Sequence, residues 1–188
     1  MSSQPPPFRT TSELEAQLGW IGGAPRRVGR LDAIVIRPAR DARRVLDSCR
    51  VDPVGGLEGD RWVHGFSSPP LPGMPEQSNQ VTAMCSRVAE TLSGTKDRWA
   101  LAGDQLYVDL DLSEESLHPG DRVRIGATAL FEVTDEPHLG CRKFARRYGD
   151  AALSWVNSPE GRRRRFRGIH FRVVSPGTVQ VGDPVVVG

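Results

Sequence analysis

Cys141 stands in a stretch whose residue types favour thiol chemistry. Gly140 precedes it, and two cations, Arg142 and Lys143, follow it directly. The thiolate is the form that attacks electrophiles and ligates metals, and nearby cations or a helix N-terminus lower the pKa of a cysteine. The pattern therefore predicts a reactive thiol at position 141, with a small buried cysteine that only packs in the core as the alternative.

Two predicted elements place this cysteine on a loop between them. Residues 129–134 form a strand-like apolar run, whereas residues 142–148 have the apolar spacing of one helix face. Pro137 interrupts the strand because it has no backbone N–H to donate. We therefore expect residues 138–141 to form the connecting loop.

A glycine-rich stretch at residues 55–65 is a candidate anion site. Its glycines flank Asp60 and Arg61, and a tight glycine turn can present backbone N–H groups to an anion, with the arginine beside them. The alternative is an ordinary turn in which Asp60 and Arg61 form a structural salt bridge. The residues themselves favour neither interpretation.

Positive charge is concentrated around and after Cys141. Residues 141–172 contain ten Lys or Arg residues and two acidic ones, a local charge of +8 in a chain whose net charge is +2. Such a patch indicates an anionic partner, whether a phosphate-bearing cofactor, an acidic protein or a nucleic acid. Nucleic acid is the weakest of the three, because the arginine run at 162–165 lacks interleaved aromatic residues apart from Phe166.

Length and composition are those of a globular protein of ordinary size. The chain has 188 residues, of which 38% are hydrophobic and 26% charged. It contains no run of the roughly 20 apolar residues that a membrane helix needs and no apolar leader, so we expect a cytoplasmic protein without membrane contact. The three cysteines form no CxxC pair, which argues against a disulfide framework or zinc site; we expect Cys85 in the core and Cys49 near the surface.

Short strands separated by glycine turns dominate the predicted secondary structure. This pattern, with a first strand at residues 28–37, predicts a mainly β fold, a β-barrel with a few short helices. We expect residues 1–27 to form an N-terminal arm and a short helix, and residues 28–188 to form the barrel domain. Residues 66–79, rich in Pro, Ser and Gly, are expected to form a surface loop, either a lid or a tolerated insertion.

Three further local patterns predict a helix start, a helical turn and a solvated strand face. Ser12 and Glu15 have the spacing of a capping box, and residues 39–50 are expected to hold a helical turn or more. Asp109 and Asp111 lie on one face of an alternating strand. Because alternation alone produces such a pair, we favour a solvated sheet face over a metal site.

Six motifs in order resemble the MOSC domain, the module named after the C-terminal domain of molybdenum cofactor sulfurases. The resemblance runs from about Val28 to Val187. It implies a β-barrel in which Cys141 is the functional cysteine, with a pocket formed by Asp60, Arg61, His138, Lys143 and Arg167. The motifs are Gly55 to Arg61, Gly103 to Leu106, His118 to Gly126, Pro137 to Cys141, Arg167 to Val174 and Val181 to Asp183.

The resemblance implies two kinds of chemistry for Cys141. Its thiolate either ligates molybdenum in a pterin-bound molybdenum cofactor, as in MOSC proteins that reduce N-hydroxylated compounds, or carries sulfur as a persulfide. A partner protein would then supply electrons or sulfur, since we recognise neither a ferredoxin nor a pyridoxal-phosphate domain in these residues. The alternative is a non-catalytic binding module that docks an acidic protein or an anionic ligand through its basic face.

Overall fold

A computed structural model of the chain describes residues 8–64 and 77–188. Most of the surface loop predicted at residues 66–79 lies outside the described residues, so its proposed role as a lid stays a prediction. Its last three residues, Gln77–Asn79, form a short 3-10 helix, η2, that leads into the barrel.

Seven strands close into a β-barrel, which confirms the predicted mainly β fold. The order around the barrel is β11-β7-β8-β9-β5-β6-β1, and β1 pairs with β11 to complete the circle. Neighbouring strands are antiparallel except β5 and β6, which are parallel. A closed barrel satisfies the backbone groups that an open sheet edge would expose. The strands are β1 (Val28–Ile36), β5 (Val81–Cys85), β6 (Leu106–Asp109), β7 (Arg122–Ile125), β8 (Ala129–Val133), β9 (Ile169–Ser175) and β11 (Pro184–Val187).

Residues 39–50 contain strands, so the helical turn predicted there is wrong. Cys49 and Val51 are buried while their neighbours are exposed, and this period of two is that of a half-buried strand. The strand is completed by pairing with a distant segment, which no local pattern reveals. β2 (Arg44–Leu46) pairs with the end of β1, whereas β3 (Ser48–Asp52), β4 (Gly56–Leu57) and β10 (Gly177–Gln180) form a separate three-stranded sheet.

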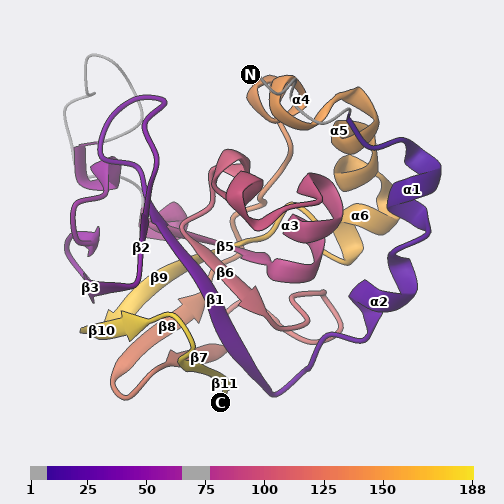
Figure 1. The fold of residues 1–188 in the computed structure, drawn as a ribbon. Helices are drawn as coiled ribbons and strands as arrows, with labels where there is room; N and C mark the ends of the chain where they lie inside the picture. The colour runs from indigo at the N-terminus through magenta and orange to yellow at the C-terminus, as the bar shows by residue number, and fades with distance from the viewer. Residues whose placement is uncertain (1–7, 65–76) are drawn as a thin grey trace.

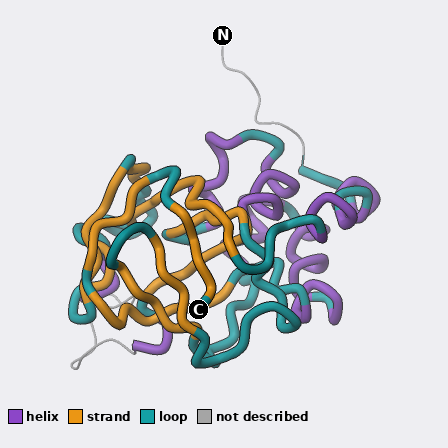
Figure 2. Tube along the Cα trace, turned by 90° about the horizontal axis from the view of Figure 1, so that it is seen from below, coloured by secondary structure: helices purple, strands orange, loops and turns teal. Residues whose placement is uncertain are grey.

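The α-helices gather on one side of the barrel (Figures 1 and 2). Their arrangement leaves the small sheet with β3 and β10 on the opposite side of the molecule in Figure 1. These α-helices are α1 (Thr11–Glu15), α2 (Leu18–Gly22), α3 (Ser86–Ser93), α4 (Arg142–Tyr148), α5 (Asp150–Asn157) and α6 (Pro159–Arg163). Of the 3-10 helices, η1 (Arg61–His64) lies on the side of the small sheet, and η3 (Lys96–Ala102) follows α3.

The first helix begins two residues earlier than predicted. Its capping box consists of Thr10 and Glu13: Thr10 Oγ1 accepts a hydrogen bond from the Glu13 N–H at 3.3 Å, and Glu13 Oε2 accepts one from the Thr10 N–H at 2.7 Å. Ser12 and Glu15, the predicted pair, have the same spacing but lie inside the helix. Entry at Thr10 places Leu14 in the core, where it is fully buried.

The barrel interior is filled by apolar side chains of the strands. Phe131 in β8 and Phe171 in β9 pack with ring centres 5.6 Å apart. All five residues of β5 are buried, because the barrel interior covers one of its faces and α3 packs against it from outside. Within the described ranges, no helix has both the length and the apolar character needed to cross a bilayer.

Candidate functional site around Cys141

Cys141 lies directly before α4 and is exposed. The helix predicted at residues 142–148 is found with those bounds. The backbone of Cys141 is extended, with φ −126° and ψ 176°, so the residue occupies the N-cap position at the end of the loop that leaves β8. The thiol is therefore accessible from solvent at the start of a helix.

Gly140 is clamped against α5, and this contact fixes the residue before the thiol. The Gly140 N–H donates to Asn157 Oδ1 at 2.9 Å, and Asn157 Nδ2 donates to the Gly140 carbonyl at 3.0 Å. A Cβ atom at position 140 would lie 2.8 Å from Leu153 and 2.9 Å from Val156. The missing side chain of glycine therefore permits this close approach to α5.

The surroundings of Cys141 lower the pKa of its thiol. Partial burial by itself would raise the pKa. The backbone N–H groups of Phe144 and Lys143 at the start of α4, together with the charges of Arg167 and Arg147, outweigh that effect. The sulfur forms no capping hydrogen bond of regular geometry, so we attribute the effect of these amide groups to their dipoles. The thiolate fraction at neutral pH consequently exceeds that of an ordinary cysteine.

The other two cysteines are buried and lack this activation. Burial raises the pKa of both thiols to about 11. Cys85 lies in the core as predicted, whereas the surface position predicted for Cys49 is wrong, since only 6% of that residue is exposed. Its Sγ donates to the carbonyl oxygens of Arg50 at 3.2 Å and Glu58 at 3.7 Å.

Arg167 is an anchored charge near Cys141. Its Nη1 donates to Asp104 Oδ2 at 2.6 Å, and its Nη2 donates to the carbonyl oxygen of Ala102 at 3.0 Å. The guanidinium carbon lies 5.2 Å from the ring centre of Phe144 in α4. These contacts hold the guanidinium in place. From this position its positive charge lowers the pKa of the Cys141 thiol.

His138 packs against His170 with the two rings tilted and their centres 4.4 Å apart. Burial, and then the charges of Arg167, His170 and Arg37, lower the pKa of His138 well below its ordinary value. The ring is therefore neutral at pH 7. Its Nδ1 lies 3.5 Å from Asp104 Oδ1, which makes this a contact with a neutral imidazole and no ion pair. Neither atom has a hydrogen-bond partner in the described part of the chain.

Asp60 holds Arg37, and both of its carboxylate oxygens are occupied. Oδ2 accepts from the backbone N–H of Arg37 at 2.8 Å and from its Nε at 3.0 Å, while Oδ1 accepts from Nη2 of Arg37 at 3.1 Å and from the Trp62 N–H at 2.9 Å. The structural salt bridge considered from the sequence thus exists, but Arg37 rather than Arg61 is the partner. Asp60 is 4% exposed, so its carboxylate is suited to holding the glycine-rich loop in position.

Arg61 and Lys143 come together in a basic pocket of about 390 Å³. Five basic side chains and one acidic side chain, Asp41, line it. The side chain of Arg61 has no hydrogen bond or ion pair within residues 8–64 and 77–188. The basic pocket is lined by Arg37, Ala39, Arg40, Asp41, Arg43, Arg61, Gly103 and Lys143.

Arg43 has unmet hydrogen-bonding capacity in the basic pocket. Its Nε is buried and has no partner among the described residues, although Nη1 donates to the Ala42 carbonyl at 2.6 Å. Burial, and then the charges of Arg147 and Arg37, lower the pKa of the Arg43 guanidinium. Crowded cations with an unsatisfied donor favour a bound anion, which would relieve their repulsion.

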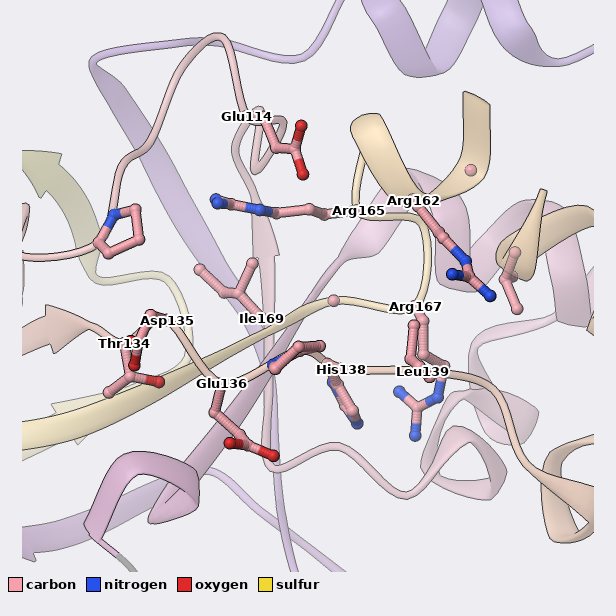
Figure 3. A pocket seen from close by; sticks show the side chains of 15 residues that line it. Glu114, Thr134, Asp135, Glu136, His138, Leu139, Arg162, Arg165, Arg167 and Ile169 are labelled. Atoms are coloured by element: carbon pink, nitrogen blue, oxygen red, sulfur yellow. The ribbon is translucent and has the colours of Figure 1, made fainter. Parts of the chain in front are cut away.

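His138 and Arg167 line a second cavity, of about 320 Å³ (Figure 3). Cys141 lines neither space, but it lies on the segment between His138, which lines the second cavity, and Lys143, which lines the basic pocket. Of the site residues predicted from the sequence, Arg61 and Lys143 line the basic pocket and His138 and Arg167 line the second cavity, whereas Asp60 lines neither.

Asp104, Arg37 and Arg43 are important to this arrangement and were not predicted as site residues. Asp104 belongs to the Gly-Asp-Gln motif at residues 103–105, so a sequence signal for it exists. Arg37 and Arg43 lie in no such motif. Their roles depend on contacts between distant segments, such as the pairing of Arg37 with Asp60 across 23 residues.

The other candidate charges are used in surface ion pairs. Asp109 pairs with Arg87 at 2.7 Å, and the described residues contain no group of three or more His, Cys, Asp or Glu side chains arranged to hold a metal ion. Two members of the arginine run, Arg163 and Arg164, both pair with Glu160 on α6. That part of the run is consistent with the solvated face expected from the sequence.

A family model described as "MOSC domain" matches residues 81–186, more than half of the chain. The match includes His138, Cys141, Lys143 and Arg167, whereas Asp60 and Arg61 precede it. No curated protein matches the chain.

Several solved structures share this fold. The YuaD protein of Bacillus subtilis has a TM-score of 0.60 and 17% identity, over 85% of this chain and 95% of that protein. YiiM from Geobacillus stearothermophilus has a TM-score of 0.55 and 19% identity, over 85% and 75% of the two chains. YiiM from Escherichia coli has a TM-score of 0.53 and 17% identity, over 85% and 69%. At this identity the likeness shows the fold alone.

Proposed function

Because the chain belongs to the MOSC domain family, we propose that it is a molybdenum-cofactor protein in which the Cys141 thiolate ligates the metal and the basic pocket holds the cofactor's phosphate. The observation that carries the proposal is the pairing of an exposed thiol of lowered pKa with a neighbouring pocket of five basic side chains. A soft thiolate suits a metal that accepts sulfur ligands, and arginine suits phosphate.

The residues of the basic pocket fit an anionic group. The buried, unpartnered Nε of Arg43 offers a donor, and the guanidinium of Arg61 offers a fork that can bind phosphate through two parallel hydrogen bonds. Lys143 adds a charge two residues after the thiol, since it is the second residue of α4. Asp60 contributes indirectly, because its carboxylate fixes the orientation of Arg37.

Residues around the thiol favour its ionised form and restrict the movement of its loop, and both effects favour metal binding. Arg167 and Arg147 favour the thiolate through their charges, and the Gly140–Asn157 clamp limits the movement of the loop. His138, neutral and partly buried, is available to form a hydrogen bond rather than a charge contact. These features reduce the cost of reorganising the loop when a ligand binds.

When bound, such a cofactor supplies two-electron redox chemistry, which fits reduction of an N-hydroxylated compound. That reaction consumes two electrons and two protons and releases one water molecule. We propose that an electron-transfer protein delivers the electrons to this chain.

Metal content of gently purified protein tests the proposal. We expect molybdenum at close to one atom per chain, with retention that depends on Cys141 and on Arg61. Protein expressed with an intact supply of cofactor that contains no molybdenum, and binds none on exposure to the released cofactor, would contradict the proposal.

A sulfur carrier is the second candidate, and the exposure of Cys141 favours it. A persulfide that passes from one protein to another needs a sulfur that both can reach, and a lowered thiol pKa also favours attack on a donor persulfide. The expected observation is labile sulfane sulfur on Cys141 without molybdenum. A sulfur-donor protein would then be the partner.

A non-catalytic module that docks an acidic protein is the remaining alternative. It makes no use of a thiol of lowered pKa, so it predicts that blocking Cys141 leaves partner binding unchanged. Loss of molybdenum or sulfane sulfur on blocking Cys141 would exclude this alternative as the sole function.

A further inference from the structure

We propose that Asp41 is an internal counter-ion of the basic pocket, whose carboxylate must leave its cations when a phosphate group binds there. Asp41 is the acidic member of the residues that line the basic pocket. The inference rests on the proposed function only in taking the incoming anion to be a phosphate group. The contacts of Asp41 with the cations are a property of the fold itself.

The carboxylate of Asp41 lies among three cations from two distant parts of the chain. Its Oδ1 is 4.0 Å from Nζ of Lys143 and 3.6 Å from Nη2 of Arg147, both on α4. Its Oδ2 is 3.8 Å from Nε of Arg40. Arg40 and Lys143 also line the basic pocket. An anion that enters the pocket therefore meets cations that already share a negative charge.

The contacts of Asp41 are weak enough to be exchanged. All three distances exceed the length of a charge-assisted hydrogen bond, about 2.7–2.9 Å, and the Asp41 side chain is 61% exposed. Exposed ion pairs of this kind contribute little to stability, because solvent screens them. A phosphate oxygen that accepts direct hydrogen bonds from Lys143 and Arg61 would form stronger contacts than the carboxylate does.

The backbone at Asp41 does not explain why a carboxylate stands there. Asp41 has a φ of 60°, in a turn closed by a hydrogen bond of 3.1 Å from the Ala42 N–H to the Ala39 carbonyl. Glycine adopts this left-handed conformation without steric cost, and asparagine tolerates it as aspartate does. The turn thus has no need of a negative charge, whereas the cations around it interact with one. Asparagine can therefore replace Asp41 and remove only the charge.

Displacement of the carboxylate makes Asp41 a threshold for binding. Separating it from its cations costs the same free energy whichever anion takes its place, so Asp41 weakens every anion that uses these cations by one common factor. A weakly bound anion then stays largely unbound, whereas a phosphate group that also contacts Arg43 and Arg61 still binds. In contrast, a carboxylate that stayed in place would repel a doubly charged anion more than a singly charged one.

NMR titration with two probes of similar shape separates displacement from repulsion. Methyl phosphate carries about 1.5 to 2 negative charges at pH 7, whereas dimethyl phosphate carries one. Binding is followed at the amide signals of Arg43, Arg61 and Lys143. We expect Asp41→Asn to tighten both probes by the same factor, about three- to tenfold, because the variant keeps the turn and removes the competing charge. High salt should reduce this factor, since exposed charges are screened.

A matched control is Asp47→Asn, which removes the same charge from an exposed residue outside the basic pocket; it should leave both titrations unchanged. Unchanged or weaker binding to Asp41→Asn, an equal gain with Asp47→Asn, or a larger gain for methyl phosphate than for dimethyl phosphate would overturn the inference and leave the phosphate site standing. Failure of both probes to bind would overturn the inference together with the phosphate site of the proposed function. Equal gains for the two probes in a protein that contains no molybdenum would support the inference and remove the molybdenum proposal alone.

Discussion

Asp104 and Arg167 form a buried ion pair that links two segments 63 residues apart, with 2.6 Å between Asp104 Oδ2 and Arg167 Nη1. Asp104 is fully buried, and Arg167 is only 8% exposed. The pair holds a positive charge near Cys141 without leaving the guanidinium free to move. A role for Arg167 as a direct phosphate ligand, expected from the resemblance, therefore stays a prediction, whereas its charge already acts on the thiol.

Removing a cation near Cys141 should raise the pKa of the thiol. The thiolate is negative, so Arg147→Gln withdraws a charge that stabilises the ionised form, and the midpoint of alkylation rate against pH should move upward. At pH 7 the variant should react more slowly with iodoacetamide than the unmodified protein. Arg172→Gln, which changes an arginine paired with Glu132, is the control and should leave the profile unchanged.

Breaking the Asp104–Arg167 pair should cost stability. Arg167→Gln leaves the Asp104 carboxylate buried without its charged partner, for which we expect a loss of about 3–5 kcal/mol in the free energy of unfolding. Arg167→Gln combined with Asp104→Asn should lose less than the sum of the two single changes, because the double variant contains no unpaired buried charge. Urea unfolding of the three variants measures this coupling, and strictly additive losses would contradict it.

Cys141→Ser should abolish retention of molybdenum or of sulfane sulfur, whereas Cys49→Ser and Cys85→Ser should leave either intact. The reason is that burial raises the pKa of Cys49 and Cys85 to about 11, while Cys141 is exposed and has a lowered pKa. Elemental analysis and cyanolysis of the three variants provide the measurement. Unchanged metal, sulfur and activity in Cys141→Ser would show that the thiol is not the functional group.

Local sequence patterns predicted the elements around the thiol well. The helix at residues 142–148 has the predicted bounds, and the first strand ends within one residue of its predicted end. Both have strong periodic apolar patterns that agree with the tertiary structure. Cys141 could be chosen as the candidate thiol for the same reason, because its glycine, its cations and the following helix are all close in sequence.

Long-range contacts explain what the sequence did not reveal. The strand β3 depends on pairing with β10, so charged residues near position 44 suggested a helix in error. Cys49 is buried by the same sheet. The basic pocket likewise unites Arg43 and Arg61 with Lys143 from the other half of the chain. A family resemblance could suggest Arg61 and Lys143, but the partner of Asp60 and the buried Nε of Arg43 follow only from the folded structure.

Gly140→Ala should destabilise the protein and disturb the thiol. The new Cβ would lie 2.8 Å from Leu153 and 2.9 Å from Val156, so the loop or these two side chains of α5 must shift, at a cost of about 1–3 kcal/mol. Gly19→Ala is the matched control, since a Cβ there meets nothing within 4 Å in α2; it should be neutral or slightly stabilising. Thermal unfolding and the alkylation rate of Cys141 measure both effects. Similar behaviour of the two variants would show that the Gly140 clamp has no role.

Arg61→Lys should weaken anion binding in the basic pocket by at least ~1 kcal/mol, the scale of one charge-assisted hydrogen bond. Lysine retains the charge but cannot form the two parallel hydrogen bonds that a guanidinium offers to phosphate. Arg163→Lys combined with Arg164→Lys is the control, because both arginines pair with Glu160 on α6 and lie outside the basic pocket. Titration with inorganic phosphate, followed by calorimetry, should show a loss for Arg61→Lys and almost none for the control. Equal small effects would mean that the basic residues act only as a diffuse field, and the acidic-protein docking module would then become the favoured function.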